Sequence, residues 1–126
     1  MIYLASPYSA KLPDSLERDE VVEHKRYMEA CIAAGFIMLK GDLVYSPIAH
    51  WHIIDQLFKG MVGYEDYLAA DCKMIELCSE VHVLMIEGWD KSKGVLLEIE
   101  YAKVKNKPVK YFKNTPEGVV YADKIS

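Results

Sequence analysis

The stretch Val81–Val109 constrains the fold of this chain more than any other part of the sequence. It begins with an apolar run of strand length, passes through a polar turn, and continues as a helix-length segment that ends at Asn106-Lys107-Pro108 before a second apolar run. This order predicts strand, loop, helix and strand, which is the unit from which parallel sheets are built. The stretch therefore predicts an α/β protein with helices packed on its sheet.

Other short apolar runs supply the remaining strands. Ile2–Ala5, Leu43–Tyr45, Val81–Ile86 and Val109–Phe112 are predicted to be parallel strands, and Val119–Tyr121 is a candidate edge strand after a turn. The chain contains no repeat, low-complexity segment or linker. Residues 1–126 are therefore expected to form a single domain, an α/β layer sandwich with a parallel sheet of four or five strands.

Two segments have the apolar spacing of helices. Glu17–Leu39, which carries Arg18 and Arg26, and Tyr64–Cys78 both place apolar residues near helical spacing. By contrast, His50–Gly63 is rich in bulky residues without a clear period, and we expect it to be irregular or weakly helical.

The composition excludes several classes of function. The 126 residues carry a formal net charge of −4, so no general basic surface for nucleic acid is expected. No segment reaches the ~18 consecutive apolar residues of a membrane-spanning helix. Its first residues have neither the basic start nor the long apolar run of a signal peptide, so none is expected, and its three cysteines are an odd set that indicates free thiols. We therefore expect a cytoplasmic protein.

Histidines and cysteines do not indicate a metal centre. His50 and His52 flank Trp51 as a His-x-His pair, but no third ligand is evident and no metal is expected. His82 alternates with valines in a predicted strand, and we expect it to be a hydrogen-bonded core histidine.

The loop after the third predicted strand is the first candidate site. Loops at the carboxyl ends of parallel strands are where open α/β sheets bind ligands. Ser92 and Gly94 open the following helix, whose first amides can hold an anion. Glu98 stands one turn further in, although a helical glutamate is more often a solvated surface residue. In the same loop, Trp89 would either cover a base or pack under the loop.

Asp71 is the second candidate. Its helical neighbours Tyr67, Leu68, Met74 and Ile75 are apolar, so its carboxylate is expected to point toward the core. A carboxylate with a pKa raised by burial would suit a general acid. The alternative, weighted equally, is an aspartate at the rim of the sheet that caps a neighbouring loop.

The loops after the first two strands carry further candidates. Ser6-Pro7-Tyr8-Ser9 offers hydroxyls and turn amides, although an ordinary proline turn is the simpler interpretation, and Ser46-Pro47-Ile48-Ala49-His50 follows the second strand in the same way. Arg18 or Arg26, if turned toward these loops, would pair with a phosphate. We expect one pocket to collect residues from all of these segments: Tyr3, Ser6, Tyr8, His50, Asp71, Gly88, Ser92 and Glu98.

Several motifs together resemble the nucleoside 2-deoxyribosyltransferase-like superfamily, which includes nucleoside 5′-monophosphate N-glycosidases. The similarity covers nearly all of residues 1–112 and is greatest to short prokaryotic and phage members. It rests on IYLASPYS at Ile2–Ser9, Arg26, YSPIAH at Tyr45–His50, Asp71 and GWDKSKGVLLEI at Gly88–Ile99. The resemblance implies a flavodoxin-like three-layer sandwich, often with sites completed in a homo-oligomer.

The resemblance also implies roles for individual residues. Ser92, Gly94, Val95 and Glu98 fit the glycosidase pattern Ser-x-Gly-Val-x-x-Glu, in which the glutamate attacks the sugar C1′ and the serine contacts a phosphate. Asp71 matches the second carboxylate. Tyr3 matches a tyrosine that contacts the nucleophile, so the implied catalytic set is Glu98, Asp71 and Tyr3. The expected substrate-binding set is Ser6, Pro7, Tyr8, Arg26, His50, Gly88, Trp89, Ser92 and Gly94.

The function expected from the sequence is cleavage or transfer of the N-glycosidic bond of a nucleoside or nucleoside 5′-monophosphate. Two carboxylates in two roles suit this chemistry, and it needs no cofactor or metal. Hydrolysis and transfer to another base remain equally open. The alternatives are a non-catalytic protein that binds or sequesters a nucleotide or an NAD derivative, and a structural α/β module whose pocket is vestigial.

Overall fold

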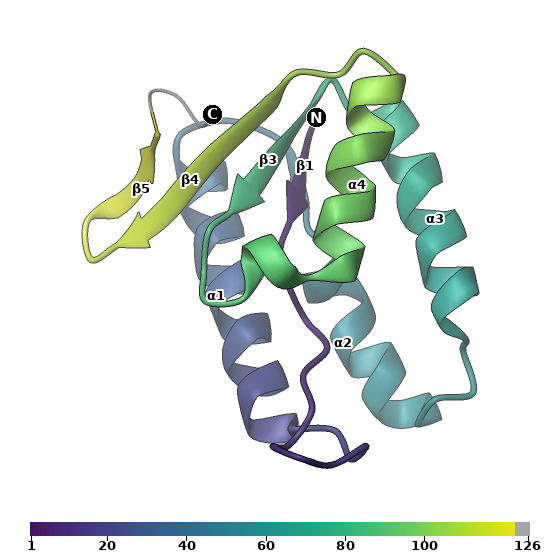
Figure 1. Ribbon diagram of the computed structural model, residues 1–126. Helices are drawn as coiled ribbons and strands as arrows, with labels where there is room; N and C mark the ends of the chain where they lie inside the picture. The colour runs from purple at the N-terminus through teal and green to yellow at the C-terminus, as the bar shows by residue number, and fades with distance from the viewer. Residues whose placement is uncertain (123–126) are drawn as a thin grey trace.

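Five strands form one sheet in the computed structural model of the protein, which describes residues 1–122. They are β1 (Ile2–Ala5), β2 (Val44–Tyr45), β3 (Glu80–Leu84), β4 (Val109–Thr115) and β5 (Gly118–Tyr121). Their order is β2-β1-β3-β4-β5, and all neighbours are parallel except β4 and β5. Figure 1 shows β1, β3, β4 and β5 side by side in this order. The predicted α/β fold and its four parallel strands are confirmed. The edge strand β5 is antiparallel because a two-residue turn joins it to β4.

The helices are α1 (Glu20–Leu39), α2 (Pro47–Phe58), α3 (Tyr64–Leu77) and α4 (Lys93–Val104), with a short 3₁₀ turn η1 (Trp89–Lys91) before α4. The predicted start of the first helix at Glu17 is wrong. Asp19 is its N-cap, and the Asp19 carboxylate accepts a hydrogen bond from the Val22 amide at 3.1 Å. Arg18 therefore lies in the preceding loop, paired with Lys11 in an antiparallel bridge.

The segment His50–Gly63, expected to be irregular or weakly helical, is for the most part regular helix, because it contains most of α2. Ser46 caps the helix by accepting a hydrogen bond from the Ala49 amide at 3.1 Å, and Pro47 occupies the first turn. Serine followed by proline is a regular helix start. Lys59 ends α2 in the left-handed conformation, at φ 42°.

The sheet separates two hydrophobic layers. Alternate residues of the strands face α3 and α4 on one side, where Tyr3 and Val83 pack against Ile75 and Val95. The other residues face α1 on the opposite side, where they form a second core cluster of Ile2, Leu4, Ala33, Ile37, Leu84 and Phe112. Because both faces of the central strands are covered, β1 is buried along its whole length.

The strand order places a topological switch point between β1 and β3. From β1 the chain crosses to β2 on one side, and from β3 it crosses to β4 on the other. The loops after β1 and β3 therefore diverge at the carboxyl edge and leave a crevice between them, which is the usual ligand position in such sheets. Among residues 1–122, no helix combines the length and hydropathy needed to span a membrane.

Candidate active site

A cleft of about 860 Å³ lies at the carboxyl edge of the sheet. Its walls come from the β1–α1 loop, α2, α3 and the beginning of α4. The volume is within the range of sites that hold small organic ligands. The predicted site residues that line this cleft are Ser6, Tyr8, Asp71, Ser92, Gly94 and Glu98.

Glu98 lines the cleft from the second turn of α4 and is only 6% exposed. The hydroxyl of Tyr3, which is fully buried in β1, donates a hydrogen bond to Glu98 Oε2. Burial raises the pKa of Glu98 to about 8; the Tyr3 hydrogen bond opposes this rise, and the negative charge of Asp71 adds to it. Tyr3 thus contacts the carboxylate from below without itself lining the cleft.

Asp71 faces the same cleft from α3. Its Oδ1 accepts a hydrogen bond from Trp51 Nε1 on α2 at 3.1 Å. Burial raises the pKa of Asp71 to about 6, and the Trp51 hydrogen bond opposes the rise. Because the charge of Asp71 also affects Glu98, the two carboxyl groups form a pair that titrates across the neutral range.

The start of α4 gives the cleft an end suited to anions. Ser92 is the N-cap, and its Oγ accepts a hydrogen bond from the Val95 amide at 3.2 Å. Lys91 and Lys93 line the cleft beside it, so that two cations add to the positive end of the helix dipole. From the β1–α1 loop, the Ser6 Oγ is buried and has no hydrogen-bond partner within residues 1–122.

Two predicted binding residues, Arg26 and Gly88, lie outside the cleft and tie its loops together. The Arg26 guanidinium donates to the carbonyl oxygens of Tyr8 (3.3 Å), Ser9 (2.9 Å) and Glu87 (3.3 Å). Gly88 has φ 90°, and a Cβ there would lie 2.6 Å from Arg26 Nη2. Arg26 therefore holds the β1–α1 loop against the loop after β3, and Gly88 leaves room for it.

Three other predicted binding residues also lie away from the cleft. His50 is exposed and packs on Tyr45 and Trp51. Adjacent residues of a helix point in different directions, so α2 brings Trp51 to the cleft and leaves His50 outside it. Trp89 packs against Tyr111, with ring centroids 5.6 Å apart, so it packs under the loop and does not cover the cleft. Pro7 is fully buried.

The cleft wall also contains a set of polar residues, which we call the Arg18 cluster: Arg18, Glu23, Asp55 and Tyr67. Arg18 was a candidate from the sequence, as a partner for a phosphate, whereas Glu23, Asp55 and Tyr67 were not predicted as site residues. Arg18 pairs with both carboxylates at 2.8 Å, and the Tyr67 hydroxyl donates to Asp55 Oδ1 at 3.2 Å. A correct helical assignment of α2 would have indicated Asp55, because it lies one turn after Trp51 on the same face.

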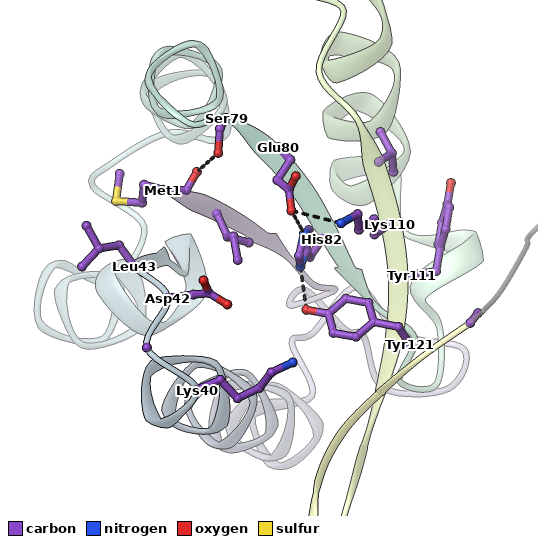
Figure 2. A pocket seen from close by; sticks show the side chains of 14 residues that line it. Met1, Lys40, Asp42, Leu43, Ser79, Glu80, His82, Lys110, Tyr111 and Tyr121 are labelled. Carbon is purple, nitrogen blue, oxygen red and sulfur yellow. Dashed lines mark hydrogen bonds and ion pairs between the residues drawn. The ribbon is translucent and has the colours of Figure 1, made fainter.

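A second cavity, of about 1110 Å³, lies at the opposite, amino edge of the sheet. There His82 bonds to Glu80 through Nε2 and to the Tyr121 hydroxyl through Nδ1, and Lys110 also pairs with Glu80 (Figure 2). His82 is 4% exposed, and both of its ring nitrogens have partners. The prediction of a hydrogen-bonded core histidine is confirmed.

Residues 1–122 hold no group of three or more histidine, cysteine, aspartate or glutamate side chains placed to bind a metal ion. The fold and the cleft define the class of this protein. It is an α/β sandwich in which two carboxyl groups of raised pKa, those of Asp71 and Glu98, line a cleft at the switch point of the sheet. The chain belongs to the family described as a domain of unknown function (DUF1937), whose profile matches residues 1–114. No curated protein matches it in a sequence comparison.

Proposed function

We propose that this protein is a member of the nucleoside 2-deoxyribosyltransferase-like superfamily. In this proposal it cleaves or transfers the N-glycosidic bond of a nucleoside or nucleoside 5′-monophosphate, with Glu98 as the nucleophile. The observation that carries the proposal is the buried Glu98 carboxyl, hydrogen-bonded to Tyr3 from below and sharing one cleft with Asp71. The anion-favouring start of α4 beside this pair suits a 5′-phosphate.

The first step breaks the bond between the sugar and the base. The ionised Glu98 carboxylate attacks C1′ while the bond to the base nitrogen breaks, and the bonding electron pair leaves with the base. Asp71 in its protonated form gives its proton to that base. The sugar passes through a state with positive charge at C1′, which the Glu98 carboxylate stabilises before it forms a glycosyl ester.

The second step releases the sugar from Glu98. The Asp71 carboxylate, ionised after the first step, accepts a proton from water or from an incoming base as that molecule attacks C1′. The bond between C1′ and Glu98 then breaks, and its electron pair returns to the carboxylate. Attack by water makes the protein a hydrolase, whereas attack by a second base makes it a transferase.

A substrate panel tests the proposal. The protein is incubated with ribonucleosides, 2′-deoxyribonucleosides, their 5′-monophosphates and NAD, and free base is measured by chromatography. A second, labelled base is added to half of each reaction, so that exchange reveals transfer. We expect base release from at least one substrate. A panel in which nothing is cleaved contradicts the proposal.

A non-catalytic nucleotide-binding protein is the second candidate. It is favoured by the pKa of about 8 for Glu98, since a carboxyl group that is mostly protonated at neutral pH donates a hydrogen bond to a ligand and does not attack it. Such a protein would show a raised melting temperature with a ligand from the panel and no release of base.

Tyr3→Phe tests whether the Tyr3 hydroxyl controls the ionisation of Glu98. The variant loses the hydroxyl that bonds to Glu98 and that holds its pKa down, so the pKa of Glu98 should rise further. We expect kcat/KM to fall roughly 10- to 100-fold, the size of one hydrogen bond to a charged group. The descending limb of the pH–rate profile, which lies near the Glu98 pKa, should move to higher pH.

The control is Tyr45→Phe, because Tyr45 packs on Tyr3 at 6.0 Å between ring centroids but its hydroxyl has no bond to Glu98 among the described residues. An unshifted pH profile in Tyr3→Phe would show that the hydroxyl does not tune Glu98.

A further inference from the structure

The guanidinium of Arg18 is held on one edge only. Its Nε donates to Glu23 at 3.0 Å, and its Nη2 lies 2.8 Å from both Glu23 Oε1 and Asp55 Oδ2. Nη1 has no hydrogen-bond partner within residues 1–122, and the side chain is 41% exposed where it lines the cleft. The two N–H groups of Nη1 are thus the donors that this fixed fork leaves for a ligand.

Two members of the Arg18 cluster lie one helical turn from the proposed proton donor or from its hydrogen-bond partner. Along α3, Tyr67 precedes Asp71 by four residues, and along α2, Asp55 follows Trp51, the partner of Asp71, by four residues. One helical turn is about 5.4 Å, which is close to the width of a nucleobase. Because Asp71 and Arg18 also line one cleft, a base that takes a proton from Asp71 reaches Arg18 when it lies along these helices.

We propose that Arg18 determines base specificity by donating hydrogen bonds from Nη1 to a ring carbonyl oxygen. The preferred substrates would be 6-oxopurine and 4-oxopyrimidine nucleosides or nucleotides, in preference to their amino counterparts. This inference rests on the proposed function, because the position of the base follows from the role of Asp71.

The charge of the cluster favours a neutral acceptor over a phosphate. Glu23 and Asp55 carry two formal negative charges against the single positive charge of Arg18, so a further anion is disfavoured there. Both carboxylates are buried and already accept hydrogen bonds. Glu23 accepts from Arg18 and the Ala10 amide, and Asp55 accepts from Arg18 and the Tyr67 hydroxyl. The exocyclic amino group of an amino nucleobase would place its N–H donors against those of Nη1, and two donors cannot form a hydrogen bond with each other.

The inference is tested by measuring nucleotide binding to a variant that should not cleave the bound nucleotide. In the Glu98→Gln background, dissociation constants are measured by calorimetry for two pairs of nucleoside 5′-monophosphates. The first pair is inosine and adenosine 5′-monophosphate, and the second is uridine and cytidine 5′-monophosphate. We expect each oxo member to bind roughly 10- to 100-fold more tightly, as for a hydrogen bond to a charged donor. Adding Arg18→Met, which keeps the aliphatic stem but removes the donors, should reduce each ratio to about threefold or less.

Arg26→Met is the matched control. Arg26 anchors the same β1–α1 loop through Tyr8 and Ser9 but does not line the cleft, so this variant should weaken both members of a pair equally and leave the ratio unchanged. If Arg18→Met fails to fold, Arg18→Lys, which keeps one charge but loses the fork, serves in its place and should also lower the ratio.

The outcomes separate the two proposals. Equal binding within each pair, an unchanged ratio in the Arg18 variant, or no binding of any of the four nucleotides overturns the role of Arg18. Selective, Arg18-dependent binding by a protein that releases no base from the panel would support base recognition by Arg18 and contradict the proposed glycosyl chemistry. Base release without selective binding would support the glycosyl chemistry and contradict base recognition by Arg18.

Discussion

Glu98→Gln is expected to lower the rate of base release by 10²-fold or more, the cost of losing a main electrostatic contact to the transition state. Glutamine has nearly the same shape, and its carbonyl oxygen still accepts the hydrogen bond from Tyr3. It has no negative charge to face the sugar and cannot form the glycosyl ester. The buried site should remain packed, so the melting temperature should stay within roughly 4 °C, the shift that about 1 kcal/mol produces in a domain of this size.

Glu100→Gln is the control for this substitution, because Glu100 lies on the same helix α4 but is exposed. It should turn over substrate at the wild-type rate. Initial rates on the best substrate of the panel, together with melting curves, compare the three proteins. Near-wild-type turnover by Glu98→Gln would show that Glu98 is not the nucleophile.

Asp71→Asn is expected to change both the size and the pH dependence of the rate. The proposed mechanism needs Glu98 ionised, and the ionised fraction of Glu98 rises until the pH passes its pKa of about 8. It also needs Asp71 protonated, and the protonated fraction of Asp71 falls once the pH passes its pKa of about 6, so activity is highest between the two values. The wild type should therefore show a bell-shaped profile with limbs near these two values, and only a small fraction of molecules carries the active combination.

The Asp71→Asn variant should lose the descending limb, because asparagine does not titrate. Its activity should rise with pH and then level off. The loss should be roughly 10²-fold for bases that leave poorly, and much smaller for bases that leave well without a proton. Removing the negative charge of Asp71 should also lower the pKa of Glu98, so the activity of the variant should level off somewhat below pH 8.

Measurements of kcat/KM across the pH range for wild type and variant, with a good and a poor leaving base, check this prediction. Glu65→Gln, an exposed substitution at the start of α3, controls for the loss of one negative charge on the same helix. A variant that retains the bell-shaped profile, or loses activity equally for both bases, would contradict the role of Asp71 as proton donor.

The sequence was sufficient to predict the features that depend on local order. Buried strands such as Ile2–Ala5 appear as continuous apolar runs, and the alternation of strands and helices indicated a parallel sheet. Because parallel strands end at one edge, Ser6, Ser92 and Glu98 could be assigned to a common cleft before their positions were known. The apolar neighbours of Asp71 predicted its inward direction for the same reason, since helical spacing is a local property.

Features that depend on rotation or on distant partners required the tertiary structure. The sequence placed His50 and Arg26 near the right loops, but the rotation of α2 leaves His50 exposed, and the reach of Arg26 brings it to backbone carbonyls behind the cleft. The Arg18 cluster joins residues of the β1–α1 loop, α1, α2 and α3, and no local pattern specifies such a contact.

The sequence by itself therefore determined the α/β fold, the edge of the sheet that carries the cleft, and the identity of Tyr3, Asp71 and Glu98 as candidates. Only the tertiary structure decided that Tyr3 supports Glu98 from beneath, that burial raises the pKa of both carboxyl groups, and that Arg18 lines the same cleft as Asp71 and pairs with Glu23 and Asp55. The reason is physical: periodicity and strand polarity are written in neighbouring residues, whereas burial, charge coupling and hydrogen-bond partners arise when distant segments pack together.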